Sequence, residues 1–167
     1  MILDKLLKSF EHHLATVGSN NIVTAVYLEQ LGDAYTNNLN NIEHVLLYYN
    51  QALNIYWQHN ADDFLKMGLY RKIATICLQV NDVKYRKYAI NQLINALFLV
   101  LKSMIKSVMK ENIVRFNENI VAELLLSIAS AVDLPEDGEC SSLSKFFYGQ
   151  ASLWSQNPSK NKWHRQI

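Results

Sequence analysis

One spacing of apolar and small residues recurs in this sequence, and it constrains the fold more than any other feature. Residues at steps of three, one and three fall on a single stripe of an α-helix. In the first occurrence the third residue is Gly32, which costs about 1 kcal/mol relative to alanine inside a helix and therefore needs a packing reason. The three occurrences are Leu28, Leu31, Gly32 and Tyr35; Tyr70, Ile73, Ala74 and Cys77; and Leu125, Ile128, Ala129 and Val132.

A second small residue follows each of these stripes at a similar distance. Ala52 stands 20 residues after Gly32, and the two later pairs, Ala74 with Ala96 and Ala129 with Ala151, are each 22 residues apart. Small residues in both partners allow two antiparallel helices to approach closely. The spacing therefore predicts three helix-turn-helix pairs.

The prediction for the whole chain is an all-α domain of about seven helices over residues 1–156. Two prolines and five glycines leave few chain breakers, which favours long helices over short strands. An amphipathic helix at 2–16, ended by Gly18, is expected to cap the array. The predicted parts that follow are repeat one at 21–59, repeat two at 62–110, a divergent repeat three at 113–156, and a tail at 157–167.

The first two units carry the resemblance to a known family. The first contains the strings GDAY and YYNQALNIY, and the second contains IATI. This layout resembles the tetratricopeptide repeat, and it is similar to the longer-helix variants in soluble NSF attachment proteins and kinesin light chains. The resemblance implies helix pairs stacked into a superhelix. Gly32 to Ala74 and Ala74 to Ala129 span 42 and 55 residues. Both exceed the family's period of about 34, so a compact helical bundle remains the other architecture.

The same resemblance implies a binding face, because the first helix of each tetratricopeptide unit lines a concave surface. Glu29 and Asp33 would repel a peptide's terminal carboxylate there, so a basic or mixed polar segment fits better. The other interpretation is a plain solvent-exposed face, or one filled by the third unit. The residues placed on this face are Glu29, Asp33, Thr36, Arg71, Thr75, Gln79, Glu123, Leu126 and Ser130.

The sequence lacks the common motifs of catalysis and metal binding, which argues against an enzyme. The sequence contains no GxSxG, HExxH, Walker-type phosphate loop or GxGxxG. His12 and His13 are adjacent, so on a helix they point about 100° apart, and with Glu11 they are expected to form a solvated face. Cys77 and Cys140 belong to no CxxC pair, which argues against a zinc site or a disulfide framework. We expect no catalytic residues, no metal and no cofactor.

Charge and hydropathy limit the partners and the compartment. With a net charge of +1, the chain has no strong positive electrostatic field that would attract nucleic acid. The longest apolar run, 96–101, is far shorter than the roughly 20 residues of a membrane span. Two unpaired cysteines are typical of a reducing, cytoplasmic setting. The basic tail with Trp163 is interpreted as a solvated terminus.

The expected function is a non-enzymatic scaffold or adaptor that binds a protein or peptide. One alternative is a vesicle-trafficking adaptor that resembles the soluble NSF attachment proteins and acts through its surface. The other is a homodimeric helical bundle that holds a small apolar ligand. It would pair through the strongly apolar helix at 93–109, with Leu97, Leu101 and Ile105 in the contact.

Overall fold

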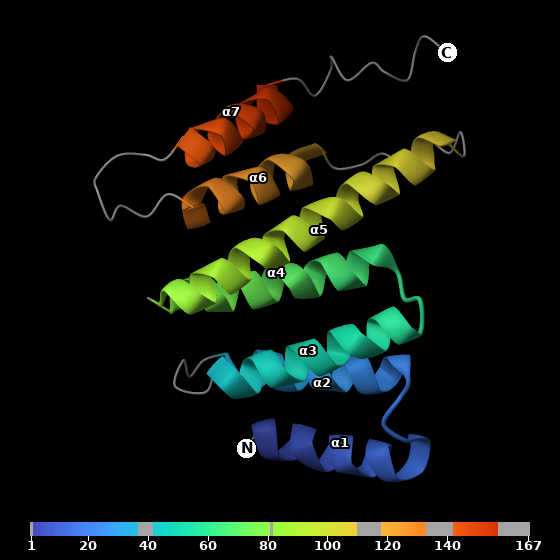
Figure 1. Ribbon diagram of the computed structural model, residues 1–167. Helices are drawn as coiled ribbons and strands as arrows, with labels where there is room; N and C mark the ends of the chain where they lie inside the picture. Colours follow the sequence, from blue (N-terminus) through green and yellow to red (C-terminus); the bar gives the residue numbers. More distant parts are fainter. Residues whose placement is uncertain (1, 37–41, 81, 110–117, 133–141, 157–167) are drawn as a thin grey trace.

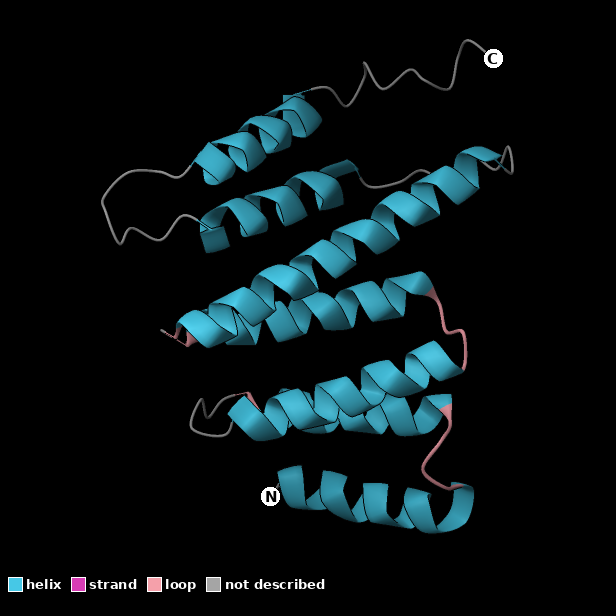
Figure 2. Cartoon of the chain, viewed as in Figure 1, coloured by secondary structure: helices cyan, strands magenta, loops and turns pink. Residues whose placement is uncertain are grey.

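The computed structural model of the chain describes residues 2–36, 42–80, 82–109, 118–132 and 142–156. Within these ranges it contains seven α-helices and no strand, which confirms the all-α prediction (Figures 1 and 2). The predicted turn at 37–41, the loop residues 134–141 and the tail 157–167 lie outside the described residues. The helices are α1 (Ile2–Val17), α2 (Ile22–Tyr35), α3 (Ile42–Gln58), α4 (Asp63–Gln79), α5 (Val83–Met109), α6 (Glu118–Val132) and α7 (Ser142–Gln156).

Local sequence signals set several of the helix ends. Gly18, with a φ of 91°, follows the last residue of α1 and donates its N–H to the carbonyl of Leu14 at 3.1 Å, as expected for a glycine at a helix C-terminus. Asp62 caps α4 by accepting the N–H of Phe64 at 2.7 Å. Both ends were predicted from the sequence.

The helices form an open array of antiparallel neighbours. The most extensive packing is within the pairs α2 with α3, α4 with α5 and α6 with α7, and the next is between sequential helices of different pairs. Figure 1 shows α1 and α7 at opposite ends of the molecule. The extensive packing is therefore between sequence neighbours, and the helices lie in an open row rather than around one closed core.

The predicted small residues lie in the core of this array. Gly32, Ala52, Ala74, Ala96, Ala129 and Ala151 are all buried. The space beside Gly32 is filled by a ring, since a Cβ placed there would lie 2.5 Å from Cδ1 of Tyr49 and closer still to Cε1. Gly32 thus makes room for the Tyr49 side chain, where the sequence pattern predicted a close approach of two backbones.

Helix α5 occupies the middle of the array but is incompletely covered. It packs on α4 and α6, yet a line of its apolar side chains faces solvent: Ile94, Phe98, Leu101 and Ile105 are 46%, 63%, 38% and 60% exposed. At 27 residues it is ten longer than α4, so its C-terminal end extends past its partner (Figure 1). The strongly apolar helix predicted at 93–109 is thus covered where it packs on α4 and α6, and it exposes apolar side chains elsewhere.

One described segment, Val83–Ser107 within α5, is long and apolar enough to cross a membrane by length and composition alone. A third of it is buried in the fold, and core helices of soluble proteins satisfy the same criterion. The expectation of no membrane span depended on uninterrupted apolar runs, and it remains a prediction.

Candidate binding groove

A groove lies between α2 and α4, and the buried Tyr49 side chain of α3 contributes to its lining. Its volume is about 490 Å³, within the range of about 300–1,000 Å³ typical of ligand sites. All of its lining comes from α2 with its C-terminal cap, α3 and α4. We call it the α2/α4 groove, and it is lined by Asp33, Thr36, Tyr49, Gly68, Arg71, Lys72, Thr75, Ile76 and Gln79.

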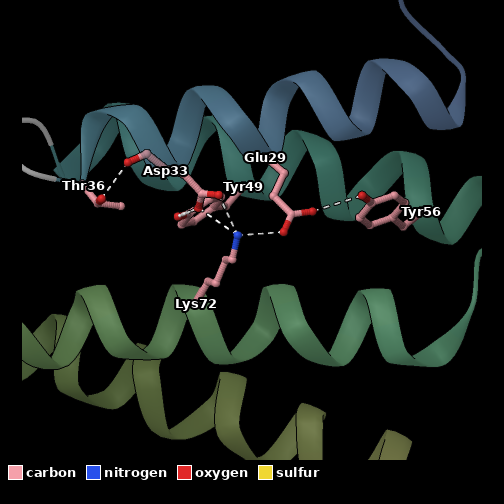
Figure 3. Close-up of polar contacts among 6 residues, drawn as sticks. All are labelled: Glu29, Asp33, Thr36, Tyr49, Tyr56 and Lys72. Atoms are coloured by element: carbon pink, nitrogen blue, oxygen red, sulfur yellow. Dashed lines mark hydrogen bonds and ion pairs between the residues drawn. The ribbon is translucent and has the colours of Figure 1, made fainter. Parts of the chain in front are cut away.

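Helical spacing explains why these side chains meet. Glu29 and Asp33 are four residues apart and so lie one turn apart on the same face of α2. On α4, Gly68, Lys72 and Thr75 stand at steps of four and three along the facing surface. Figure 3 shows the two carboxylates directed at α4 and the Lys72 side chain reaching across to them.

Lys72 joins the two helices at the centre of the groove. Its Nζ lies 2.9 Å from Oε1 of Glu29 and 2.8 Å from Oδ2 of Asp33 (Figure 3). Burial lowers the pKa of the ammonium, but the hydrogen bonds and charges of the two carboxylates outweigh that effect and leave the pKa raised. Lys72 is therefore a firmly charged cation held by two anions.

Two buried tyrosines fix the carboxylates from the other side. The hydroxyl of Tyr49 donates to Oδ1 of Asp33 at 2.6 Å, and that of Tyr56 donates to Oε2 of Glu29 at 3.1 Å (Figure 3). Burial raises the pKa of both phenols, and the adjacent carboxylates raise it further. Both phenols therefore remain donors throughout the neutral range and hold the carboxylate oxygens in a set geometry.

The charges around the groove do not fully cancel. Glu29 and Asp33 share Lys72, and Arg71 pairs with Glu123 of α6 at 3.0 Å. These three carboxylates and two cations leave one negative charge in excess, located at the pair on α2. The Arg71–Glu123 pair is 42% and 55% exposed, so it contributes little to stability.

The residues predicted for the binding face fall into three groups: some line the α2/α4 groove, some border it, and some lie away from it. Asp33, Thr36, Arg71, Thr75 and Gln79 line the α2/α4 groove. Glu29 borders it through Lys72, and Glu123 borders it through Arg71.

Ser130 lies away from the groove, and its Oγ is 3.4 Å from the hydroxyl of Tyr148 on α7. The neighbouring Leu126 is 44% exposed on α6. The third unit thus carries its predicted residues beside the groove or beyond it.

Sequence reasoning missed Lys72, Gly68 and the role of Tyr49. Counting along α4 placed Arg71 on the binding face and passed over the next residue, Lys72. The available signal was Gly68, a helix-interior glycine one turn before Lys72, where an added Cβ would have nothing within 4 Å. The ring of Tyr49 lies in the core, while its hydroxyl reaches the groove and bonds to Asp33.

The His12–His13 prediction requires correction for one of the two residues. His12 is exposed, but His13 is buried, and its Nε2 lies 2.9 Å from Oγ1 of Thr24. The Thr24 hydroxyl donates to the carbonyl of Gly18, so the hydrogen between His13 and Thr24 comes from Nε2. His13 therefore fastens α1 to α2 and is not part of a solvated face.

Metal and thiol chemistry have little support in the part of the chain that the structure covers. No cluster of three or more His, Cys, Asp or Glu residues that could hold a metal ion occurs there. Cys77 is a buried free thiol, and burial raises its pKa to about 11, which keeps it protonated.

Comparison with protein-family models and with curated proteins finds no match for this chain.

Proposed function

We propose that the α2/α4 groove binds an extended segment of a partner protein and that the chain works as a tetratricopeptide-like scaffold or adaptor. The observation that carries this proposal is the groove of about 490 Å³ that is lined by Asp33 and bordered by Glu29, with both carboxylates held in place by buried tyrosines. Fixed, partly desolvated carboxylates on an open surface suit recognition of a cationic side chain. The partner segment is therefore basic or mixed polar.

The remaining lining residues suit contact with a peptide main chain. Gln79 offers both a donor and acceptors, and Arg71 offers donors. The hydroxyl of Thr75 donates to the carbonyl of Arg71 in its own helix, so its oxygen is left as an acceptor. The open space at Gly68 allows a backbone to approach α4 closely.

The alternatives gain no comparable support. The apolar hollow between α4 and α5, bordered by Met67, Leu99 and Val100, holds about 10 Å³, roughly the room of one water molecule. A small apolar ligand does not fit there. A homodimer through Leu101 and Ile105 would bring together two α5 helices that carry basic residues and no acidic one, which opposes the pairing. The likeness in layout to the soluble NSF attachment proteins stays a prediction.

A binding measurement with charge-matched probes tests the proposal. The probes are two short fluorescent peptides, one of alternating arginine and serine and the other with glutamine in place of arginine, and the readout is anisotropy with the full chain. We expect the arginine peptide to bind more tightly. Asp33→Asn should weaken its binding about five- to tenfold, the size of one lost charge-assisted hydrogen bond.

Glu11→Gln is the matched control, because it removes the same charge from an exposed position on α1. Equal losses in Asp33→Asn and Glu11→Gln would show that only the overall charge matters. The absence of any preference between the two peptides would overturn the proposal.

A further inference from the structure

The carboxylate pair on α2 already holds a cation, and that cation comes from the chain itself. The Lys72 ammonium donates to Oδ1 and Oδ2 of Asp33 at 2.9 and 2.8 Å, and it lies 2.9 Å from Oε1 of Glu29. These three oxygens can accept all three hydrogens of an ammonium group. The geometry is that of a complete site for an alkylammonium ion.

The two sides of this contact differ in how firmly they are held. Tyr49 and Tyr56, at 1% and 0% exposure, anchor the carboxylates from below. The Lys72 side chain is 39% exposed, lies on the groove lining and has a flexible four-carbon stem. The carboxylates therefore stay in place when the ammonium leaves, and the ammonium has open solvent to leave into.

We propose that Lys72 is an internal substitute for the partner's cationic side chain and that it blocks the groove until the partner displaces it. This inference rests on the proposed function, and it makes the chemistry of the partner more specific. The group recognised at Glu29 and Asp33 is an ammonium or guanidinium ion with several N–H donors, carried by an extended segment. Any change that neutralises or removes Lys72 frees the site and raises the affinity for that segment.

Occupation by Lys72 lowers the apparent affinity for the partner, because only the fraction of molecules with a free carboxylate pair can bind. Lys72→Met keeps most of the apolar stem and removes the charge. We expect this variant to bind the arginine–serine peptide about five- to tenfold more tightly than the unmodified chain. Lys106→Met is the matched control, because Lys106 also lies near a carboxylate, Asp63 at 4.0 Å, but outside the groove.

Chemical rescue tests the cation site without any peptide. Lys72→Ala removes the equivalent of propylammonium from the site, so propylammonium chloride should refill it. We expect propylammonium to raise the melting temperature of Lys72→Ala by about 3 °C over tetramethylammonium chloride at equal ionic strength. Tetramethylammonium carries the same charge but no N–H donor. The unmodified chain and Lys106→Ala should show no such difference between the two salts.

The two experiments separate the failure of this inference from the failure of the proposed function. If the arginine–serine peptide binds the unmodified chain and Lys72→Met binds it no more tightly, the inference is wrong and the proposed function stands. If neither protein binds the peptide, the proposed function is wrong. The rescue then decides whether the carboxylate pair is a cation site, and equal melting temperatures in both salts would exclude one.

Discussion

Replacing Gly32 by alanine tests the contact that sets the distance between α2 and α3. A Cβ at this position would lie 2.5 Å from Cδ1 and 3.1 Å from Cζ of the Tyr49 ring, whereas unstrained carbon contacts lie near 3.5–4.0 Å. The ring is 1% exposed, and its hydroxyl is bonded to Asp33 at 2.6 Å. Tyr49 therefore cannot shift without losing core packing or that hydrogen bond.

The expected cost follows from three contributions. Overpacking a core site costs about 1–3 kcal/mol. Loss of a hydrogen bond to a charged group costs about 1.5–3 kcal/mol, while alanine in place of glycine recovers about 1 kcal/mol of helix propensity. We expect Gly32→Ala to lower the free energy of unfolding by about 2 kcal/mol. For a chain of 167 residues, that corresponds to about 4–8 °C in melting temperature.

Gly68→Ala is the matched control, because Gly68 also lies inside a helix but has nothing within 4 Å of an added Cβ. This variant should gain about 0.5–1 kcal/mol from helix propensity alone. Urea unfolding followed by circular dichroism measures both variants. Equal stability of Gly32→Ala and Gly68→Ala would refute the assignment of the Tyr49 ring to the space beside Gly32.

Three further predictions follow from the titratable groups. In the unfolded chain Tyr49 ionises near its ordinary pKa of 10.0, but burial raises its pKa in the folded chain. The free energy of unfolding, measured in urea, should therefore fall as pH rises above about 10. Tyr49→Phe should lower the free energy of unfolding by about 1.5 kcal/mol at neutral pH and reduce this dependence on pH. Burial raises the pKa of Asp63, but the hydrogen bond and charge of Lys66, together with the charges of Lys102 and Lys106, outweigh it and lower the pKa. Stability should therefore fall as pH decreases below about 4, and Asp63→Asn should weaken this dependence. Cys77 is fully buried, so in a variant whose other cysteine is serine, a thiol reagent should label the chain only after unfolding.

Several parts of the fold were accessible from the sequence because they depend on contacts close in the chain. The three-one-three spacing places four residues on one helical stripe whatever the tertiary structure, and it correctly predicted buried positions in α2, α4 and α6. The ends at Gly18 and Asp62 depend on one turn of backbone and were predicted for the same reason. The covered faces of α5 depend on where α4 and α6 pack against it, which residue spacing does not reveal.

The candidate site was harder to predict because its central contact joins two helix pairs. Lys72 meets Glu29 and Asp33 only because α4 packs beside α2 at a particular rotation. A helix rotated by one residue, about 100°, would place Arg71 at the carboxylates. Counting along the helices placed Arg71 and the two acids on that face, but it could not distinguish between the adjacent cations Arg71 and Lys72.

The walls of the groove belong to different helix pairs, and this has a mechanical consequence. Packing between α3 and α4 is less extensive than packing within either pair, so a small change in the angle between the pairs widens or narrows the space between α2 and α4. The Lys72 side chain spans that space and joins α4 to the carboxylates of α2. Breaking these ion pairs removes a direct constraint on the width of the groove. The width of the α2/α4 groove is thereby linked to the angle between the first two helix pairs.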